Sequence, residues 1–339
     1  MVEFAGYEMP VQYSSVIAEA TAVRKEAGMF DVSHMARLQL TGERVLEFLE
    51  HVTTNDVSKL ENGRGQYSLL PNAEGGVVDD IIVYRITDNE YRMVVNAANH
   101  QKDVAWLKKH NTFGVEMVDW TDQTAMIAVQ GPKAASILVG MASDSSLIES
   151  APMFGFVELE IAGVSVWGAR SGYTGEDGFE VICAAKDADR LWDALVAAGV
   201  TPCGLASRDT LRVEAGLPLY GHELNDEMSP LCAGLGWVIS KTKSFIGSEH
   251  VQKARAEGVS KKIHGVRLGS KRLPMPGMAV LQGDATVGEV TSGVYSPVLE
   301  CGIAFVLVDS SLPLGSEVAL DIRGKAELGI LVNKRFLKS

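Results

Sequence analysis

The chain has 339 residues, of which 46% are hydrophobic and 22% charged, and its formal net charge is −12 at pH 7. This length suits two or three domains with substantial cores, and the composition is typical of a globular protein. The acidic balance argues against nucleic acid as a partner, because phosphate binding needs a basic face. No apolar run is long enough to span a bilayer, so no membrane association is expected.

The amino terminus lacks a basic region followed by an apolar stretch. We therefore expect a cytoplasmic protein, or one of the mitochondrial matrix if a leader has been removed. The four cysteines form no CxxC pair, and the seven histidines show no HxxxH or HxH spacing with a carboxylate. The sequence thus predicts no metal site.

The first elements are a helix, a strand and a second helix. Ser14 or Ser15 can cap the first helix, and Gly28 can end it. Residues 36–40 alternate between apolar and polar side chains, as in a half-buried strand. A second helix follows around residues 45–49.

A β-meander comes next. Residues 65–70 and 77–85 are strand-like and are separated by a turn at 71–76. A second turn at 88–89 leads to a strand at 91–95. Strands joined by such short turns pair antiparallel.

The chain up to about residue 250 mixes helices with strands but lacks the regular βαβ alternation of a doubly wound fold. We therefore predict an α+β class for residues 1–250. Helices are expected near 98–110, 132–140 and 186–198, and strands near 125–130, 155–170 and 178–183.

The remainder of the chain is strand-rich. Turn signals recur at Gly283-Asp284, Ser292-Gly293, Gly315-Ser316 and Arg323-Gly324. This spacing favours a small β-barrel or sandwich over residues 262–339. A polar helix end and linker at 251–262 separates the two parts.

Two adjacent carboxylates, Asp79 and Asp80, stand inside the apolar strand 77–85. Successive side chains of a strand point to opposite faces, so the two cannot line one site. At least one is expected to be partly buried, and a buried carboxylate needs a partner or a function. The pattern leaves open whether it serves chemistry or only bonds the turn amides of Gly75 and Gly76.

A glycine-rich segment spans residues 170–180. It lacks both the G-K-[ST] ending of a P-loop and the strand–GxGxxG–helix context. It is either an ordinary hairpin or a loop that presents Tyr173 and Glu180 to a ligand.

A helix is predicted after residue 204, with Ser207 as its cap and Arg208 in its first turn. A cation is unfavourable at the positive amino-terminal end of a helix. Arg208 is therefore expected to point to an anion or a carbonyl elsewhere, with a surface salt bridge as the alternative.

The order of many short blocks resembles the glycine cleavage T-protein family. The blocks are Phe4 to Tyr13, Gly28 to Met35, Thr54 to Val57, Gly75 to Asp80, Val95 to Asn99, Gln130 to Pro132, Gly172 to Glu180, Arg208-Asp209, Leu219 to Gly221, Thr291 to Gly293 and Ser296-Pro297. Each block alone is weak, but together they cover essentially the whole chain.

The resemblance implies a three-domain cloverleaf. Two interleaved α+β domains with antiparallel sheets and a carboxyl-terminal β-barrel surround a central folate channel. It also implies an aminomethyltransferase: tetrahydrofolate accepts the one-carbon unit of an aminomethyl group carried on the lipoyl arm of the partner H-protein. Ammonia leaves, and methylene-tetrahydrofolate forms.

By the same resemblance, the family's key aspartate falls on Asp80, near the reacting folate nitrogen. Glu180 would hold the amino-pyrimidine edge of the pterin through paired N–H bonds, and Arg208 would meet a pterin carbonyl or another electron-rich edge. The remaining folate-binding residues would be Tyr67 and Tyr173, as walls of the channel, and Asn96, through backbone groups.

Two other functions share this fold. One is a folate-dependent demethylase or methyltransferase that acts on a small methylated substrate. The other is a non-enzymatic folate-binding protein, whose branch carries a Lys-Gly-Cys-Tyr segment; residues 216–221 contain no cysteine. One departure from the family is Met275, which stands where relatives usually carry an arginine.

Overall fold

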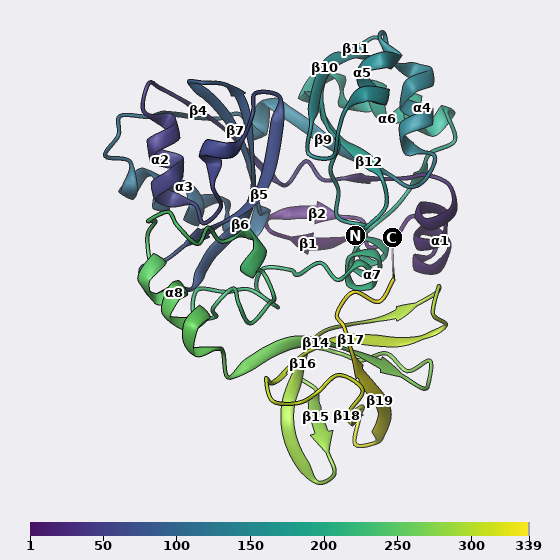
Figure 1. The fold of residues 1–339 in the computed structure, drawn as a ribbon. Helices are drawn as coiled ribbons and strands as arrows, with labels where there is room; N and C mark the ends of the chain where they lie inside the picture. The colour runs from purple at the N-terminus through teal and green to yellow at the C-terminus, as the bar shows by residue number, and fades with distance from the viewer. Residues whose placement is uncertain (338–339) are drawn as a thin grey trace.

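The structure, a computed structural model, describes residues 1–337. Residues 338 and 339, which end the predicted barrel domain, lie outside the described residues. Two sheets with their helices lie side by side above a β-barrel, and helix α7 (Leu205–Ala215) lies in the centre (Figure 1). The mixed α+β class and the carboxyl-terminal barrel are confirmed, whereas the domain boundary near residues 250–262 stays a prediction.

The first sheet has five strands in the order β5-β6-β7-β4-β8, all antiparallel. Two helices cover one of its faces, and their apolar sides form a core with the strands. In sequence order the elements are β4 (Ala36–Thr41), α2 (Val45–Val52), β5 (Arg64–Pro71), β6 (Val77–Thr87), β7 (Glu90–Val95), α3 (His100–His110) and β8 (Glu116–Asp119). The predicted meander is β5-β6-β7.

The second sheet has six strands in the order β10-β11-β12-β9-β3-β13, of which only β13 runs parallel to its neighbour. Helices α4, α5 and α6 pack on it through a second core. The elements are α1 (Val16–Lys25), β3 (Gly28–Asp31), β9 (Thr124–Gln130), α4 (Ala134–Met141), α5 (Ser145–Ser150), β10 (Phe156–Ile161), β11 (Val164–Ala169), β12 (Gly178–Ala184), α6 (Ala188–Ala197) and β13 (Thr201–Pro202). The remaining segments are the hairpin of β1 (Val2–Phe4) and β2 (Tyr7–Met9), and helix α8 (Ser248–Glu257).

The two sheets are interleaved in the chain. Strand β3 belongs to the six-stranded sheet, strands β4 to β8 build the five-stranded sheet, and the chain returns to the six-stranded sheet at β9. The faces that meet share a core in which the rings of Tyr84 and Trp167 pack edge to face, with centroids 4.9 Å apart. Such a pair adds about 0.5–1.5 kcal/mol beyond its buried area.

The carboxyl-terminal strands close into a barrel in the order β14-β17-β16-β15-β18-β19. Three of the predicted turns connect strands, but Ser292-Gly293 does not. It lies inside β16, next to a register shift, where an added Cβ on Gly293 would meet the carbonyl of Pro274. The glycine thus permits close backbone approach. The strands are β14 (Lys261–Leu268), β15 (Ala279–Gln282), β16 (Ala285–Ser296), β17 (Cys301–Asp309), β18 (Glu317–Asp321) and β19 (Ala326–Val332).

Helix α7 begins earlier than the sequence predicts. Its amino-terminal cap is Gly204, and the prediction of Ser207 as the cap is wrong. The Ser207 hydroxyl instead donates to the Gly204 carbonyl at 2.8 Å and to the buried carboxylate of Glu19 at 3.0 Å. Because Glu19 belongs to α1, this contact fixes the start of α7 against the first helix.

The same helix is bound to the barrel. The Arg212 guanidinium donates to Glu223 at 3.0 Å and to Ser292 of β16 at 2.7 Å. Two residues further along α7, the Glu214 carboxylate accepts a hydrogen bond from Ser296 at 2.5 Å. Helix α7 therefore connects the sheets to the barrel. Within residues 1–337, no helix is long and apolar enough to cross a membrane.

Candidate active site

A cavity of about 480 Å³ opens where the two sheets, α7 and the segment after β19 meet. Apolar side chains form much of its wall, with a small number of polar groups among them, as in most small-molecule sites. The six residues that the sequence predicts for the site all line it: Tyr67, Asp80, Asn96, Tyr173, Glu180 and Arg208. They come from both sheets and α7.

The two adjacent aspartates of β6 point to opposite sides. Asp80 lines the cavity, whereas Asp79 is fully buried behind it. Asp79 does not bond the glycine turn, because the Gly76 N–H donates to the side chain of Asn72. The interpretation of a turn-bonding aspartate is therefore wrong.

The Asp80 carboxyl has two side-chain donors. The Tyr67 hydroxyl donates to Oδ2 at 2.9 Å and the Asn96 amide donates to Oδ1 at 2.8 Å. Burial and the neighbouring charge of Asp79 raise the pKa of Asp80 to about 7, although both hydrogen bonds act to lower it. A carboxyl with this pKa can accept and return a proton at neutral pH.

Asn96 contributes its side chain rather than its backbone N–H. Its N–H donates to Asp79 at 2.9 Å, so that group is not available to a ligand. The side chain lines the cavity beside Asp80.

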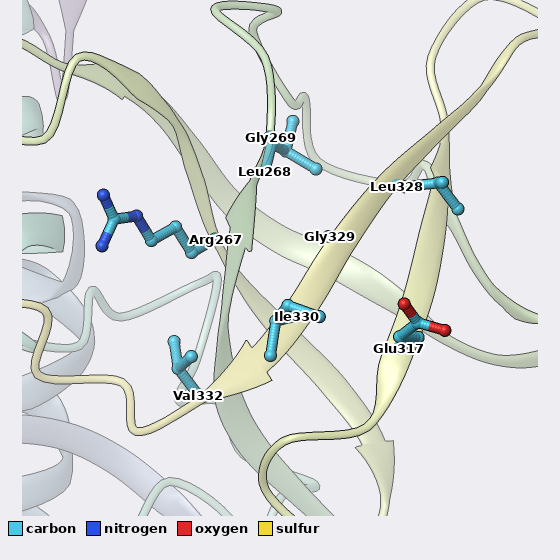
Figure 2. A pocket seen from close by; sticks show the side chains of 8 residues that line it. All are labelled: Arg267, Leu268, Gly269, Glu317, Leu328, Gly329, Ile330 and Val332. Carbon is cyan, nitrogen blue, oxygen red and sulfur yellow. The ribbon is translucent and has the colours of Figure 1, made fainter.

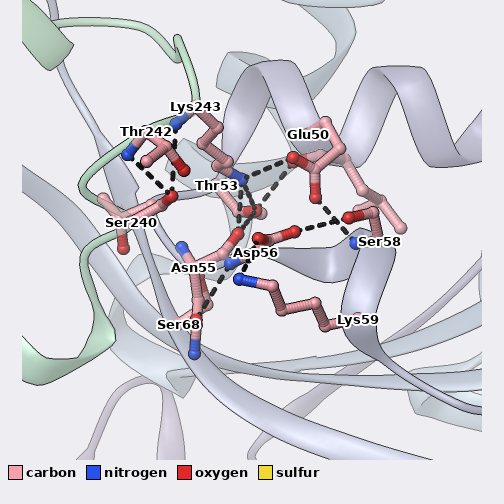
Figure 3. A network of polar contacts seen from close by, with 12 residues as sticks. Glu50, Thr53, Asn55, Asp56, Ser58, Lys59, Ser68, Ser240, Thr242 and Lys243 are labelled. Carbon is pink, nitrogen blue, oxygen red and sulfur yellow. Dashed lines mark hydrogen bonds and ion pairs between the residues drawn. The ribbon is translucent and has the colours of Figure 1, made fainter.

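A polar network joins α2, β5 and residues 240–243 (Figure 3). Its member Asn55 contacts Tyr67. The Asn55 amide donates to the Tyr67 carbonyl at 2.9 Å. Lys243 in turn donates to the Asn55 carbonyl and lies 3.4 Å from Glu50. Burial lowers the pKa of Lys243 to about 8. These bonds keep the Tyr67 backbone, and hence its hydroxyl, in place against Asp80.

Glu180 lies on β12 of the six-stranded sheet and lines the cavity. The Ser171 hydroxyl donates to its carboxylate, and Tyr84 donates to Ser171 at 3.3 Å. Burial raises the pKa of Glu180, while the Ser171 bond and the charge of Arg208 oppose that rise. Glu180 keeps acceptor capacity for a ligand, because a carboxylate has about four lone-pair sites.

Arg208 lies over the ring of Tyr173, with its guanidinium carbon 4.5 Å from the ring centroid. The ring is held because the Tyr173 hydroxyl donates to the Pro218 carbonyl. Within residues 1–337, the Arg208 guanidinium makes no hydrogen bond, so its N–H donors are free for a ligand. The alternative of a surface salt bridge is wrong.

Sequence reasoning missed Trp237 and Lys334, which also belong to the cavity wall. Trp237, 69% exposed, stacks on Tyr67 with ring centroids 6.0 Å apart. Lys334 follows β19 and donates to the Ala233 carbonyl at 2.6 Å. Neither stands in a motif; the nearest signal for Trp237 is an aromatic residue in a glycine-rich loop. Met275 is not among the lining residues.

A second hollow lies on the outside of the barrel, where β14, β18 and β19 meet (Figure 2). Apolar side chains such as Leu328 and Ile330 line most of it. Its two charged residues, Arg267 and Glu317, lie on opposite sides, and the Arg267 side chain points away from Glu317. No polar groups converge there, so this hollow lacks the features of a catalytic site.

Two family models cover nearly the whole chain. The GCVT N-terminal domain matches residues 1–243, and the glycine cleavage T-protein C-terminal barrel domain matches residues 261–338. The chain belongs to the glycine cleavage T-protein family.

Individual relatives agree with this membership. An aminomethyltransferase of Geobacillus kaustophilus is 46% identical over 332 residues, which cover 96% of this chain and 91% of the relative. An aminomethyltransferase of Thermus thermophilus is 47% identical over 327 residues, with the same shares covered. The crystal structure of the glycine cleavage system aminomethyltransferase T of Bartonella henselae superposes with a TM-score of 0.92 at 30% identity, over 99% of this chain and 93% of that one. The T-protein fold is thus shared from end to end.

Proposed function

We propose that this T-protein family member transfers the one-carbon unit of an aminomethyl group from the lipoyl arm of H-protein to tetrahydrofolate. The observation that carries the proposal is the convergence of Asp80, Glu180 and Arg208 in one cavity of a chain with aminomethyltransferase relatives. In this reaction the carbon–sulfur bond and the carbon–amine bond break, and two bonds to folate nitrogens form. The two folate N–H hydrogens end on sulfur and on the released ammonia.

The polar groups of the cavity fit a pterin. The Glu180 carboxylate can accept two parallel N–H bonds from an amino-pyrimidine edge. The Arg208 guanidinium, which has no hydrogen-bond acceptor within residues 1–337, can donate to a carbonyl or to another electron-rich edge of the ring. A cavity of about 480 Å³ lies within the usual range for small-molecule sites.

Asp80 would then serve as the proton carrier. Its pKa of about 7 means that both protonation states are populated at neutral pH. The ionised form can take the proton of a folate nitrogen, and the resulting acid can give it to the departing amine. Tyr67 and Asn96 hold the carboxyl still, so that positioning adds to the rate.

A reconstituted assay tests the function directly. With H-protein carrying an aminomethyl group, tetrahydrofolate and this chain, we expect release of ammonia and formation of methylene-tetrahydrofolate. Without H-protein, turnover should be absent. Turnover of a free methylated amine in place of H-protein would instead support the demethylase function, and folate binding without either reaction would support the non-enzymatic one.

Substitution of Glu180 by Gln should weaken tetrahydrofolate binding by about 10- to 100-fold, because one acceptor of a charge-assisted pair is replaced by a donor. Isothermal titration calorimetry measures the change. Glu160→Gln is the matched control, because Glu160 is exposed on β10 of the same sheet. Equal affinity of the Glu180→Gln variant and the control would remove Glu180 from the folate site.

Substitution of Tyr67 by Phe should move the acidic limb of the kcat profile upward by roughly one pH unit. The Tyr67 hydrogen bond lowers the pKa of Asp80, so its loss raises that pKa and leaves less ionised carboxylate at pH 7. Activity should recover at higher pH. An unshifted limb with uniformly reduced kcat would show that Tyr67 acts only through packing.

A further inference from the structure

A second pair of carboxyl groups lies behind Asp80, outside the cavity. Asp79 of β6 and Asp103 of α3 are both fully buried, with no exposed surface, and their side chains contact each other. Neither touches the space where a substrate would bind. Two buried acids side by side are costly, so their retention calls for a physical account.

The two acids differ in their hydrogen bonds. Asp79 accepts three: from the Asn96 N–H at 2.9 Å, from the Asn96 amide at 2.9 Å and from the Asn99 amide at 2.6 Å. Both oxygens of Asp103 are buried and accept none from residues 1–337. An ionised carboxylate would be unstable there, which makes Asp103 the neutral member, able to donate its O–H to Asp79. Burial raises the pKa of Asp79 as well, but its hydrogen bonds from Asn96 and Asn99 oppose that rise and favour the ionised form. Burial and the charge of Asp79 raise the pKa of Asp103 to about 11.

The charged neighbours do not alter this assignment. The nearest cation is Lys102, which opposes the rise in the pKa of Asp103. Its ammonium group already bonds the Tyr220 hydroxyl at 2.6 Å and Asp226 at 3.1 Å. The other ionisable groups that face the pair are Asp80 and the neutral phenols of Tyr67 and Tyr220.

Asn96 carries the effect of the pair into the cavity. Its amide nitrogen donates to Asp79 and also to Asp80, at 2.8 Å from Oδ1 and 3.1 Å from the backbone carbonyl. With the nitrogen facing both carboxylates, the amide oxygen is turned away from them. If Asp79 were replaced by an apolar residue, the amide would lose one of its acceptors, and only the carboxyl and backbone carbonyl of Asp80 would hold its orientation.

We propose that the Asp103–Asp79 pair is a positioning device for Asp80: neutral Asp103 steadies ionised Asp79, which orients Asn96 and places one fixed negative charge behind Asp80. A single negative charge behind Asp80 suits this role. The charge of Asp79 helps to keep Asp80 protonated part of the time near neutrality. A second charge, on Asp103, would hold Asp80 in the acid form. The inference rests on the proposed function only for the reaction that Asp80 serves.

Difference infrared titration of the intact protein tests the proposal without turnover, through the C=O stretching band of protonated carboxyl groups. We expect one band that persists above pH 8 and is absent from Asp103→Asn, and another that disappears near pH 7 and is absent from Asp80→Asn. No protonated carboxyl band above pH 8 in the wild type would overturn the assignment of Asp103, whatever the enzyme does.

Two variants separate the charge from the fold. Asp79→Asn removes the fixed charge, and the Asp80 band should then titrate at a pH lower by at least about one unit. Asp103→Asn keeps an N–H donor toward Asp79, so the Asp80 band should titrate as in the wild type. An exposed control, Asp88→Asn, should also leave it unchanged. An unshifted Asp80 titration in Asp79→Asn, or an equal shift in Asp103→Asn, would overturn the proposal.

Activity supplies an independent readout. In the reconstituted assay, Asp79→Asn should move the acidic limb of the kcat profile in the same direction as the infrared titration, with little change in KM for tetrahydrofolate. If the infrared bands titrate as expected but the protein is inactive in the assay, the proposed function is contradicted and the proposal for the carboxyl pair still holds. If Asp79→Asn instead lowers both kcat and folate affinity without shifting the acidic limb of the kcat profile, the pair has only a structural role.

Discussion

Substitution of Asp80 by Asn should lower kcat by about 10²- to 10⁴-fold, the largest effect on activity that we expect. Affinity for tetrahydrofolate should stay within a few fold of the wild type. An amide cannot carry the proton, but its oxygen still accepts the Tyr67 hydroxyl. The shape of the cavity is thus retained. Steady-state kinetics in the reconstituted assay give kcat, and calorimetry gives the affinity.

The matched control is Asp88→Asn, because Asp88 is an exposed carboxylate paired with Arg85. It should change neither quantity. If Asp80→Asn turned over at a rate close to that of the control, Asp80 could not be the proton carrier. If it lost folate affinity instead of kcat, the carboxylate would be a binding group.

The largest effect on stability is expected for Arg212→Met, which should lower the free energy of unfolding by about 3–5 kcal/mol. Arg212 and Glu223 each have side chains only 1% exposed and are 3.0 Å apart. Methionine fills the space of the arginine but leaves the Glu223 carboxylate buried without its cation. Urea denaturation followed by circular dichroism measures the loss.

A double variant distinguishes the orphaned charge from lost packing. Adding Glu223→Gln to Arg212→Met should recover part of the stability, because no unpaired charge remains. The exposed pair of Arg44 and Glu47 supplies the control, and Arg44→Met should leave the free energy of unfolding almost unchanged. A double variant no more stable than Arg212→Met would show that the burial of Glu223 is not the cause.

Local patterns in the sequence predicted most elements, because local forces decide them. Short turns between strand-like segments located the meander β5-β6-β7, and the Ser15 hydroxyl caps α1 as expected. The incorrect predictions concern side chains that form hydrogen bonds with residues distant in the sequence. Ser207 serves Glu19 instead of capping α7. Arg37, expected on a polar strand face, is 1% exposed because its guanidinium bonds the carbonyls of Met35 and Thr121.

For the site, alternation established that Asp79 and Asp80 face opposite ways but could not assign the cavity to either. That assignment depends on where β12, α7 and the segment after β19 lie, which no local pattern contains. The family resemblance selected the six residues that the structure places together, and their roles stay predictions. Trp237 and Lys334 were not predicted because only tertiary contacts bring them to the cavity wall.

The contacts of α7 also bear on how this architecture can be divided. The first family model ends at residue 243 and the second begins at residue 261, which suggests two separable domains. Physically the cut is costly, because it takes Ser292 from Arg212 and Lys334 from the cavity wall. A fragment that ends at residue 243 would therefore carry every residue predicted for folate and yet lack a complete binding site. The two segments are matched by separate family models, but the cavity forms only when both are part of one chain.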